Sequence, residues 1–503
     1  MEAFQCLADA RMFFLLNAFT STELLDGEMG FLKTLAPRLR ATLWFGLLLL
    51  LLLWVRWPFL SNVLVGEEGM HAAFVLAKSS MAPISADGVP RLMLGALDGQ
   101  PFLGATQHPI GPYVLLRGMS AFWPVDLTEP LGAGGVALRS IQARLPFLLL
   151  YALGVAGLLA RVSRMLAMRV SWIAALVAGV VLYGLSTPLA VGSSIQPQID
   201  GSVGVFLIGM ASWLLTWRAA TTPACLAAGT AGVLVGFGKQ EWVMALMAAV
   251  IATLVLGGFR WPRAWRVSLA CVVGLVVGSC LTYQLSPSDY FASFDLMDRF
   301  LAKSSGVNRF DLLSSWSNYL VPLLFILLVM TAVGLRRWSL LLQQNPGSLI
   351  VGCTSWAIAL GYAAAGWVGD GFPRYYSPAL VAALYALVSF AEVQSLQRVN
   401  RLPLWIAFGA LGCGLFINIG VIGPGLSNRV SITSMPGLPT KPLVRRFTEL
   451  AQMKSAPNSP VYVDHSSLWI YAPHLSFVHF DPSVEGTFRN NFPEASGRMQ
   501  APR

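Results

Sequence analysis

The chain has 503 residues, of which 55% are hydrophobic and only 12% are charged, and its formal net charge is +10. A soluble domain averages about 25% charged residues, so the composition argues against a protein that is solvated on all sides. The positive charge does not indicate a nucleic-acid-binding protein, because Lys and Arg gather in short loops between long apolar runs. A helix of roughly 20 apolar residues crosses a membrane and satisfies its own backbone hydrogen bonds.

The first 40 residues carry Glu23, Asp26 and Glu28, and they are too polar to form a signal peptide. We therefore expect residues 1–40 to be a cytoplasmic N-terminal segment and the first span to be uncleaved. The apolar runs predict eleven membrane spans, at 41–60, 143–160, 171–191, 200–217, 223–237, 240–258, 267–285, 319–335, 348–367, 376–391 and 403–423.

The loops between these spans alternate in charge. The short loops on one side are rich in arginine, and the positive-inside rule makes that side cytoplasmic. Its basic residues are Lys33, Arg38, Arg40, Arg161, Arg164, Arg169, Arg218, Arg260, Arg263, Arg266, Arg336, Arg337, Arg398 and Arg401. The predicted topology is weakest at the pair 223–237 and 240–258, since a single broken helix there would reverse the orientation of every later span.

Three stretches fall on the outer side. The first, 61–142, contains a short apolar segment at 113–123 that we expect to lie on the membrane surface as an interfacial helix. The second is the charged stretch 286–318. The third is the tail 427–503, where 461–464 and 475–480 have strand-like patterns.

These features predict an all-α polytopic membrane protein of about eleven transmembrane helices. It has a transmembrane domain at 41–425, interfacial helices in the large first outer loop, and a small α/β extracytoplasmic appendage in the tail 427–503. Five of the six cysteines sit in apolar runs and none forms a C-x-x-C pair, so we interpret them as packing residues.

Two groups in the first outer loop are candidates for chemistry. Glu67 and Glu68 are adjacent carboxylates a few residues beyond the first span, where one could act as a general base and the other could orient a ligand or bind a metal. The alternative is a solvated acidic pair at a helix N-terminus. His108, which opens His-Pro-Ile-Gly-Pro, could bind phosphate or a metal, or it could simply cap the interfacial helix.

Three further candidates lie at outer span ends. Asp200 is either a cap for the fourth span or a site residue. Lys239 and Glu241 lie between two apolar runs beside Gly236 and Gly238. The lysine is suited to a phosphate group, and the alternative is a Lys239–Glu241 pair that stabilises a tight turn.

Arg374 opens the tenth span on the outer side and departs from the positive-inside trend, so it needs a specific partner, such as a lipid phosphate or diphosphate. Tyr375 is either a second ligand-binding residue or an ordinary interfacial aromatic residue. Together the candidates place carboxylates and cations on one membrane face. That combination is typical of a site where cations hold a phosphate while a carboxylate activates an acceptor.

Over residues 40–425 the chain resembles the GT-C polyprenyl-phosphate-sugar-dependent glycosyltransferases, which include dolichyl-phosphate-mannose protein mannosyltransferases and lipid A aminoarabinose transferases. Glu67-Glu68 stands where the family has Asp-Glu, and His108-Pro109-Ile110-Gly111 is similar to its His-Pro-Pro-Leu element. The remaining matches are Arg144-Leu145-Pro146, Asp200, the Gly236–Gln240 element around Lys239, the loop from Tyr290-Phe291 to Arg299-Phe300, and Arg374-Tyr375. The departures are Glu67 in place of Asp, Ile110 and Gly111 in place of Pro and Leu, and Gln240 in place of a frequent Gly.

The resemblance implies a GT-C-like fold and an inverting sugar transfer from a polyprenyl-phosphate donor to a protein, lipid A or cell-envelope glycan acceptor. Glu67 and Glu68 would be catalytic, and His108, Asp200, Lys239, Glu241, Arg374 and Tyr375 would bind substrates. No cofactor is certain. A divalent metal held by Glu67, Glu68 or His108 is an open alternative. We expect the inner membrane of a bacterium, with the N-terminus cytoplasmic, and membrane lipids but no nucleic acid as partners.

Two other classes of function compete with this interpretation. One is a ligase or polymerase that moves whole lipid-linked glycans. The other is a membrane transporter or flippase, which should show matched broken helices in two halves, and the sequence has none.

Overall fold

A computed structural model provides the fold of the chain. The residues that it describes are 37–61, 64, 72, 92–97, 100–104, 110–122, 131, 135–168, 172–217, 220–257, 261–285, 309–335, 338–364, 373–394, 445, 448, 449, 452, 461–463, 471 and 477–479. All structural statements below concern these residues.

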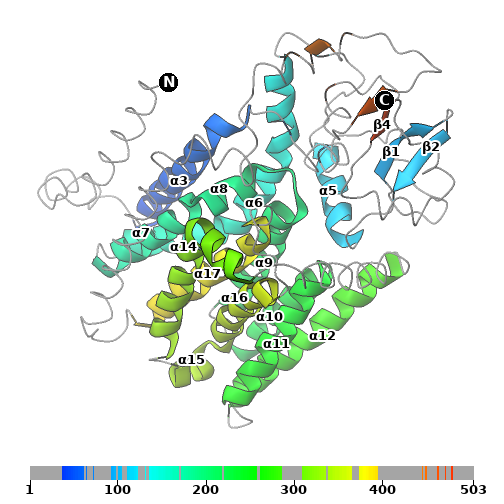
Figure 1. The fold of residues 1–503 in the computed structure, drawn as a ribbon. Helices are drawn as coiled ribbons and strands as arrows, with labels where there is room; N and C mark the ends of the chain where they lie inside the picture. The colour runs from blue at the N-terminus through cyan, green and yellow to red at the C-terminus, as the bar shows by residue number, and fades with distance from the viewer. Residues whose placement is uncertain are drawn as a thin grey trace, which may run out of the picture.

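The described chain is a helical bundle with a small sheet at one end (Figure 1). The helical elements are α3 (Pro37–Arg56), η1 (Trp57–Phe59), α5 (Ile110–Phe122), α6 (Gly135–Met168), α7 (Trp172–Ser186), α8 (Pro188–Ile195), η2 (Ile199–Gly204), α9 (Val205–Leu215), α10 (Thr221–Gly236), α11 (Gln240–Gly257), α12 (Pro262–Leu285), α14 (Arg309–Leu335), α15 (Trp338–Gln344), α16 (Pro346–Ala364), η3 (Pro373–Tyr376) and α17 (Ser377–Gln394). The strands are β1 (Leu92–Leu97), β2 (Gln100–Gly104), β3 (Val461–Val463) and β4 (Phe477–His479).

The chain is an integral membrane protein built from helices. Among the described residues five helices are long and apolar enough to cross a membrane, or up to seven if each of two bent pairs is one span. Each of the ten predicted ranges up to residue 391 coincides with a helix or a bent helix pair. The eleventh predicted span, 403–423, lies outside the described residues, so the number eleven stays a prediction.

The structure corrects the form of several predicted spans. The second starts at Gly135 rather than at residue 143 and keeps Pro146 inside the helix. The third breaks at Pro188, where α7 and α8 bend by 55°, because a proline cannot donate the next helical hydrogen bond. Thr187 caps the second half of this bent pair by accepting a hydrogen bond from the Ala190 amide.

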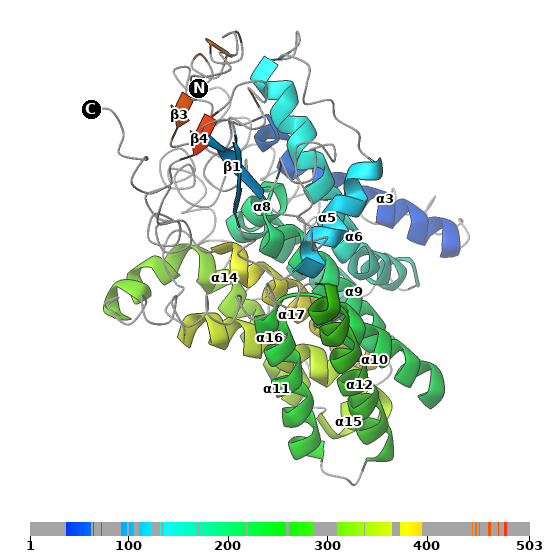
Figure 2. The ribbon, with the colours of Figure 1, turned by 90° about the vertical axis from the view of Figure 1, so that its right-hand side faces the viewer.

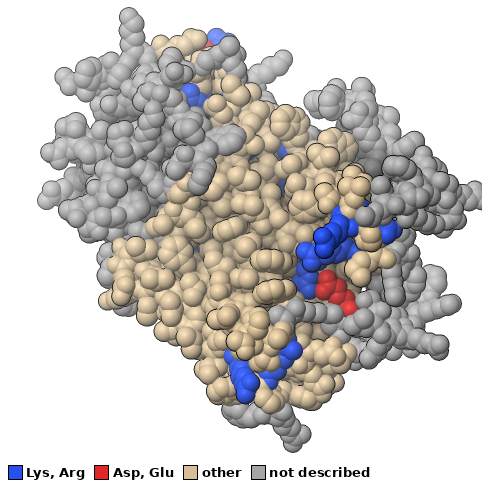
Figure 3. Space-filling view, turned by 180° about the vertical axis from the view of Figure 1, so that it is seen from behind, with Lys and Arg blue, Asp and Glu red and all other residues tan. Residues whose placement is uncertain are grey.

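The bundle has a buried centre and an apolar outside. Nearly all side chains of α17 are buried, whereas only 11% of the apolar window of α3 is buried, so α3 lies at the lipid-facing edge. Figure 3 shows one side of the molecule as a broad surface without Lys, Arg, Asp or Glu, with Lys and Arg gathered in separate groups around its edge. An uncharged belt of this kind is what a protein presents to hydrocarbon.

Helices α10, α11 and α12 form a group that lies side by side in both ribbon views (Figures 1 and 2). Small residues set the contact between α10 and α12: a Cβ on Gly232 would lie 2.2 Å from the Cys271 carbonyl oxygen, and one on Gly236 would lie 2.5 Å from that of Leu275. Because residue numbers rise together along this contact, α10 and α12 run parallel. Helix α11 must therefore return the chain between them, and 223–237 and 240–258 are two antiparallel helices rather than one broken helix.

The four strands form one sheet in the order β2-β1-β4-β3. Strands β1 and β2 come from the first outer loop and pair as an antiparallel hairpin, whereas β3 and β4 come from the tail and pair in parallel. The central contact joins Gly95 to Val478. The strand-like segments predicted in the tail are present, and the sheet that they complete includes the first outer loop, which the sequence analysis did not predict.

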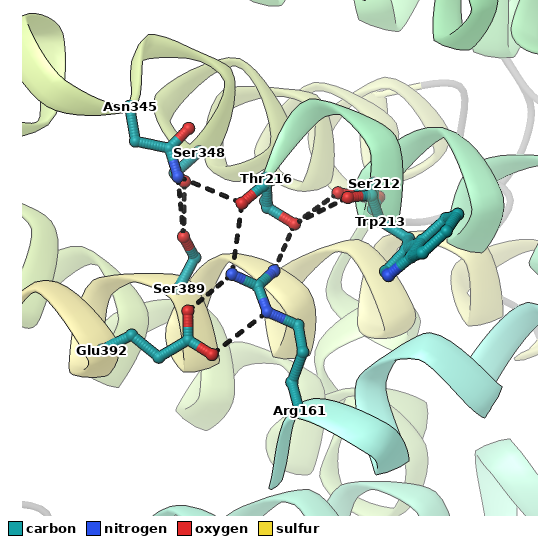
Figure 4. A network of polar contacts seen from close by, with 8 residues as sticks. All are labelled: Arg161, Ser212, Trp213, Thr216, Asn345, Ser348, Ser389 and Glu392. Carbon is teal, nitrogen blue, oxygen red and sulfur yellow. Dashed lines mark hydrogen bonds and ion pairs between the residues drawn. The ribbon is translucent and has the colours of Figure 1, made fainter. Parts of the chain in front are cut away.

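A polar network closes the bundle at the end far from the sheet (Figure 4). Arg161 of α6 donates to Glu392 of α17 at 2.6 and 3.2 Å and to the backbone oxygen of Thr216 at 3.2 Å. Asn345, just before α16, donates to the same Thr216 oxygen at 3.1 Å and to Ser389 at 3.3 Å. The network joins four helices at this end of the bundle.

This geometry predicts a stability effect for Glu392→Gln. Loss of the charge leaves the Arg161 guanidinium, whose side chain is 10% exposed, without its ion-pair partner. We expect a loss of about 1–3 kcal/mol in the free energy of unfolding, measured by thermal unfolding in detergent. The control is Glu449→Gln, which breaks the exposed pair with Arg445 and should change stability by less than about 0.5 kcal/mol. Equal effects of the two variants would contradict the structural role of the network.

Candidate functional site

Four of the predicted site residues meet at one end of the bundle, opposite the network of Figure 4. Asp200 lies in η2 at the start of α9, and Lys239 lies in the short break between α10 and α11. Arg374 and Tyr375 lie in η3, which leads into α17. Helices α9 and α17 each run from this end to the network, so the two polar groups mark opposite ends of the same helices.

A buried ion pair forms the centre of the site. The Lys239 ammonium nitrogen lies 2.8 and 2.9 Å from the two carboxylate oxygens of Asp200, and the second contact has hydrogen-bond geometry. The two side chains are only 2% and 3% exposed. A buried charge without a partner would cost several kcal/mol, so each residue fixes the position of the other.

Aromatic rings surround the ammonium group. Lys239 Nζ lies 5.2 Å from the centre of the Tyr375 ring and 5.9 Å from that of Trp242. The guanidinium carbon of Arg374 lies 5.1 Å from the same Tyr375 ring. Both cations therefore lie close to the Tyr375 ring. The separation of Lys239 Nζ and the Arg374 guanidinium carbon is at most the sum of their distances to the ring centre. Cation–π attraction of this kind strengthens when the groups are desolvated.

Glycines allow this close approach. A Cβ on Gly204 would lie 2.6 Å from the Trp242 ring, and a Cβ on Gly238 would lie 2.7 Å from it. A Cβ on Gly201 would lie 2.1 Å from the carbonyl oxygen of Ser193. The π-helical turn η2 thus packs directly against its neighbours, and such turns inside helices are frequent at functional sites.

The electrostatic setting keeps Lys239 charged. Burial acts to lower the pKa of the Lys239 ammonium group, but the Asp200 carboxylate, with help from Glu241 and Tyr375, outweighs burial and raises that pKa above its ordinary value. Glu241 lies in the first turn of α11, where a negative charge is favourable at a helix N-terminus. Lys239 is consequently protonated, and the Asp200 carboxylate balances its charge.

The structure adds contacts that bear on the alternatives for Lys239 and Asp200. Lys239 pairs with Asp200, thirty-nine residues away, so it does more than stabilise a local turn with Glu241. Asp200 is not the cap of its helix, because the N-cap position is Gln198, which makes no side-chain capping bond. The sequence analysis predicted that Asp200 and Lys239 lie on one membrane face, but it did not predict the direct bond between them.

The predicted surface helix lies against the site. Helix α5 covers most of the predicted segment 113–123 and contacts η2 and α12. A Cβ on Gly111 would lie 1.9 Å from the carbonyl oxygen of Phe237, two residues before Lys239. Any larger residue at position 111 would push α5 away from the Lys239 turn.

Glu67, Glu68 and His108 lie outside the described residues, so their predicted roles stay predictions. Just before the acidic pair in the sequence, the residues up to 61 and Leu64 are described. Arg144 of α6 donates to the Leu60 carbonyl oxygen at 3.2 Å. Arg56, fully buried, donates to Ser194 at 2.6 Å and to the Leu185 carbonyl oxygen at 2.8 Å.

A metal site is not seen within the described part of the chain, where no three His, Cys, Asp or Glu side chains come together. The residues predicted as possible metal ligands are the three that the structure does not describe. Asp200 and Glu241 together carry too few ligand groups for a metal site, and Lys239 occupies the Asp200 carboxylate.

The sequence analysis missed several residues that build the site. Trp242 packs on two glycines and faces Lys239, and a Trp three residues after a buried Lys was a possible signal. Tyr362 of α16 stacks on Tyr375 with ring centres 5.2 Å apart. Tyr362 comes from another span, and nothing in its local sequence indicates this contact.

Comparison with known proteins gives similarity in structure only. No protein-family model matches the chain, and no curated protein is similar to it in sequence. The chain is similar to ArnT from Cupriavidus metallidurans in the apo state, with 16% identity, a TM-score of 0.46 and coverage of 90% of this chain and 91% of that one. It is also similar to the Archaeoglobus fulgidus oligosaccharyltransferase in complex with Zn and sulfate, with 12% identity, a TM-score of 0.36 and coverage of 87% and 62%.

Both solved structures are less than 25% identical to the chain, and both TM-scores are below 0.5. At these identities and TM-scores they assign neither a donor nor an acceptor to this chain. Its function is therefore proposed from its own residues.

The packing of α5 gives a sharp test within one helix. Gly111→Ala should displace α5 from the Phe237 turn and lower the free energy of unfolding by about 1–3 kcal/mol, measured by thermal unfolding in detergent. Gly118→Ala is the matched control, since a Cβ at Gly118 meets nothing within 4 Å and alanine favours a helix. A Gly111→Ala protein as stable as Gly118→Ala would show that α5 does not pack on the site.

Proposed function

We propose that the chain is a membrane glycosyltransferase of the GT-C kind that transfers a sugar from a polyprenyl-phosphate donor to an acceptor on the outer face of the membrane. One observation carries the proposal. At one end of an apolar bundle, beside helix α5, the buried Lys239–Asp200 pair and Arg374 lie near the Tyr375 ring. Ionisable groups are costly at such depth, and they mark functional sites.

In this proposal the cations bind the donor phosphate. Arg374, half-buried at the start of α17, meets the phosphate first and can bind it in a bidentate manner. Lys239 stabilises the negative charge that develops on the leaving phosphate as the glycosidic bond breaks. Tyr375 keeps the two cations in place through its ring.

Asp200 has a different role from the one that its position in the sequence indicates. Its carboxylate is bonded to Lys239, so it positions the ammonium group rather than the sugar or the acceptor. An ammonium group has three donors, and Asp200 leaves at least one of them for a phosphate oxygen. Glu241 adds a second negative charge near Lys239, which keeps the lysine protonated before the donor arrives.

The acidic pair supplies the catalytic base. Glu67 removes the proton of the acceptor hydroxyl group, whose oxygen attacks the anomeric carbon as the bond to the phosphate oxygen breaks. This single displacement inverts the anomeric configuration. Glu68 and His108 position the acceptor and the sugar, or they bind a divalent metal that would polarise the phosphate.

We place this reaction on the extracytoplasmic face of a bacterial inner membrane, with the N-terminus in the cytoplasm. The alternation of arginine-rich loops and the up–down–up path of α10, α11 and α12 support this orientation. A ligase for lipid-linked glycans would use the same kind of site. Labelled monosaccharide and oligosaccharide donors, given separately to the purified protein, distinguish these two activities.

The acidic pair provides the first test. Glu67→Gln should lower the turnover of a labelled polyprenyl-phosphate sugar at least 100-fold, because an amide cannot accept the acceptor's proton. The size of the side chain is preserved, so expression and thermal stability should remain normal. Undiminished turnover would remove Glu67 from the mechanism.

The ion pair provides the second test, in which stability and activity are separated. Lys239→Gln leaves the Asp200 carboxylate buried without its partner, and we expect both stability and transfer to fall. The double variant Lys239→Gln with Asp200→Asn removes both charges, so stability should recover while transfer stays at least 100-fold low. Arg161→Gln, which removes a buried paired cation at the opposite end of the bundle, should reduce stability only. Recovery of transfer in the double variant would contradict the proposed role of Lys239.

A further inference from the structure

The tail of the chain contacts the base of the first outer loop through one tyrosine. The Tyr471 hydroxyl accepts a hydrogen bond from the Leu64 amide at 2.9 Å and lies 2.6 Å from the hydroxyl of Ser140 in α6. Tyr471 is 1% exposed and Leu64 is fully buried. This contact joins residues 407 positions apart in the sequence.

The direction of each hydrogen bond follows from its neighbours. Ser140 donates its one hydroxyl proton to the Val136 carbonyl oxygen at 2.7 Å. In the contact between the two hydroxyl groups, Tyr471 is therefore the donor and the Ser140 oxygen is the acceptor. The phenol oxygen accepts from Leu64 at the same time, so the Tyr471 hydroxyl both donates and accepts.

The same loop segment is held at two other points. Arg144 binds the Leu60 carbonyl oxygen, and Arg56 ties the end of α3 to Ser194 of α8. Both of these contacts are made by residues of the bundle, whereas the contact at Leu64 is made by Tyr471 of the tail. Glu67 follows Leu64 by three residues in the sequence.

The tail has a second attachment to the first outer loop. Tyr471 lies in the connection between β3 and β4, whose parallel pairing requires a crossover of this kind. Strand β4 in turn pairs with β1 of the loop through Gly95 and Val478. The tyrosine and the sheet therefore attach the tail to the loop at Leu64 and at Gly95, which lie on either side of Glu67 and Glu68 in the sequence.

We propose that Tyr471 is a positioning residue for the acidic pair, and that the tail completes the active site rather than forming a separate appendage. The role in turnover rests on the proposed function, in which Glu67 is the general base. The position of the Leu64 segment does not rest on it. A general base must lie within hydrogen-bond reach of the proton that it removes, so a loosened Leu64 segment lowers turnover more than it weakens donor binding.

The test removes one oxygen atom from each of two buried tyrosines. Tyr471→Phe removes the bonds to Leu64 and Ser140. Tyr385→Phe is the matched control, because the Tyr385 hydroxyl is also buried, accepts from the Leu158 amide at 3.0 Å and donates to the Gly154 carbonyl oxygen at 2.9 Å. That control lies in the bundle core, between α17 and α6.

Hydrogen exchange of the full-length protein in detergent measures the position of the segment without any substrate. In Tyr471→Phe the peptide covering residues 61–72 should exchange at least 10-fold faster than in the wild type, and in Tyr385→Phe its rate should be unchanged. Equal rates in all three proteins would overturn the proposed contact, whether or not the protein transfers sugar.

Kinetics with a labelled polyprenyl-phosphate sugar test the consequence for turnover. Tyr471→Phe should lower kcat about 10-fold with less than a 3-fold change in KM for the donor, whereas Tyr385→Phe should change neither by more than 2-fold. A loss of kcat of the same size in both variants would show that Tyr471 acts only as a packing residue. Wild-type protein without transfer activity, but with the exchange effect intact, would contradict the proposed function and leave the contact standing.

Ser140→Ala offers an independent route if Tyr471→Phe does not fold. It removes the acceptor of the Tyr471 proton and keeps the ring, so we expect the same direction of change with a smaller size. The double variant should be no worse than Tyr471→Phe alone, because the Ser140–Tyr471 bond is already lost in Tyr471→Phe. Additive losses would show that the two residues act separately.

Discussion

The bond between Lys239 and Asp200 is the interaction on which the arrangement of the outer end depends. Neither charge is stable alone in an apolar bundle, so the break between α10 and α11 must lie beside η2. That requirement explains the glycines at 204 and 238, which leave room for the Trp242 ring. It also explains why α5 can approach, since Gly111 lets it rest on Phe237.

The opposite end follows the same physical rule with a different result. Arg161 and Glu392 form a bidentate pair, and hydroxyl and amide groups from α9, α16 and α17 satisfy the remaining donors and acceptors (Figure 4). The site end instead has a lysine near the rings of Tyr375 and Trp242 and an arginine near the Tyr375 ring. The cluster around Arg161 closes one end of the bundle, whereas the cluster around Lys239 has the composition of an anion-binding site.

Much of this was predictable from the sequence, because membrane spans and loop charges are properties of continuous segments. The runs of apolar residues predict the helices, and the placement of Asp200, Lys239 and Arg374 at outer span ends predicts that they share a face. The Asp200–Lys239 bond, the contact of Tyr362 with Tyr375 and the docking of Tyr471 on Leu64 were not predictable. Each depends on which helices are neighbours, and on packing between residues that are far apart in the chain.

The sheet shared by the first outer loop and the tail has a consequence for the order in which the protein is made. Residues 64 and 95 leave the ribosome early, but their partners at 471 and 478 follow after every described helix has been synthesised. During that interval the Leu64 amide and the edge of β1 have no partner from the tail. A nascent chain can thus insert all of its described helices before Leu64 gains its hydrogen bond to Tyr471 and before β1 gains its pairing with β4.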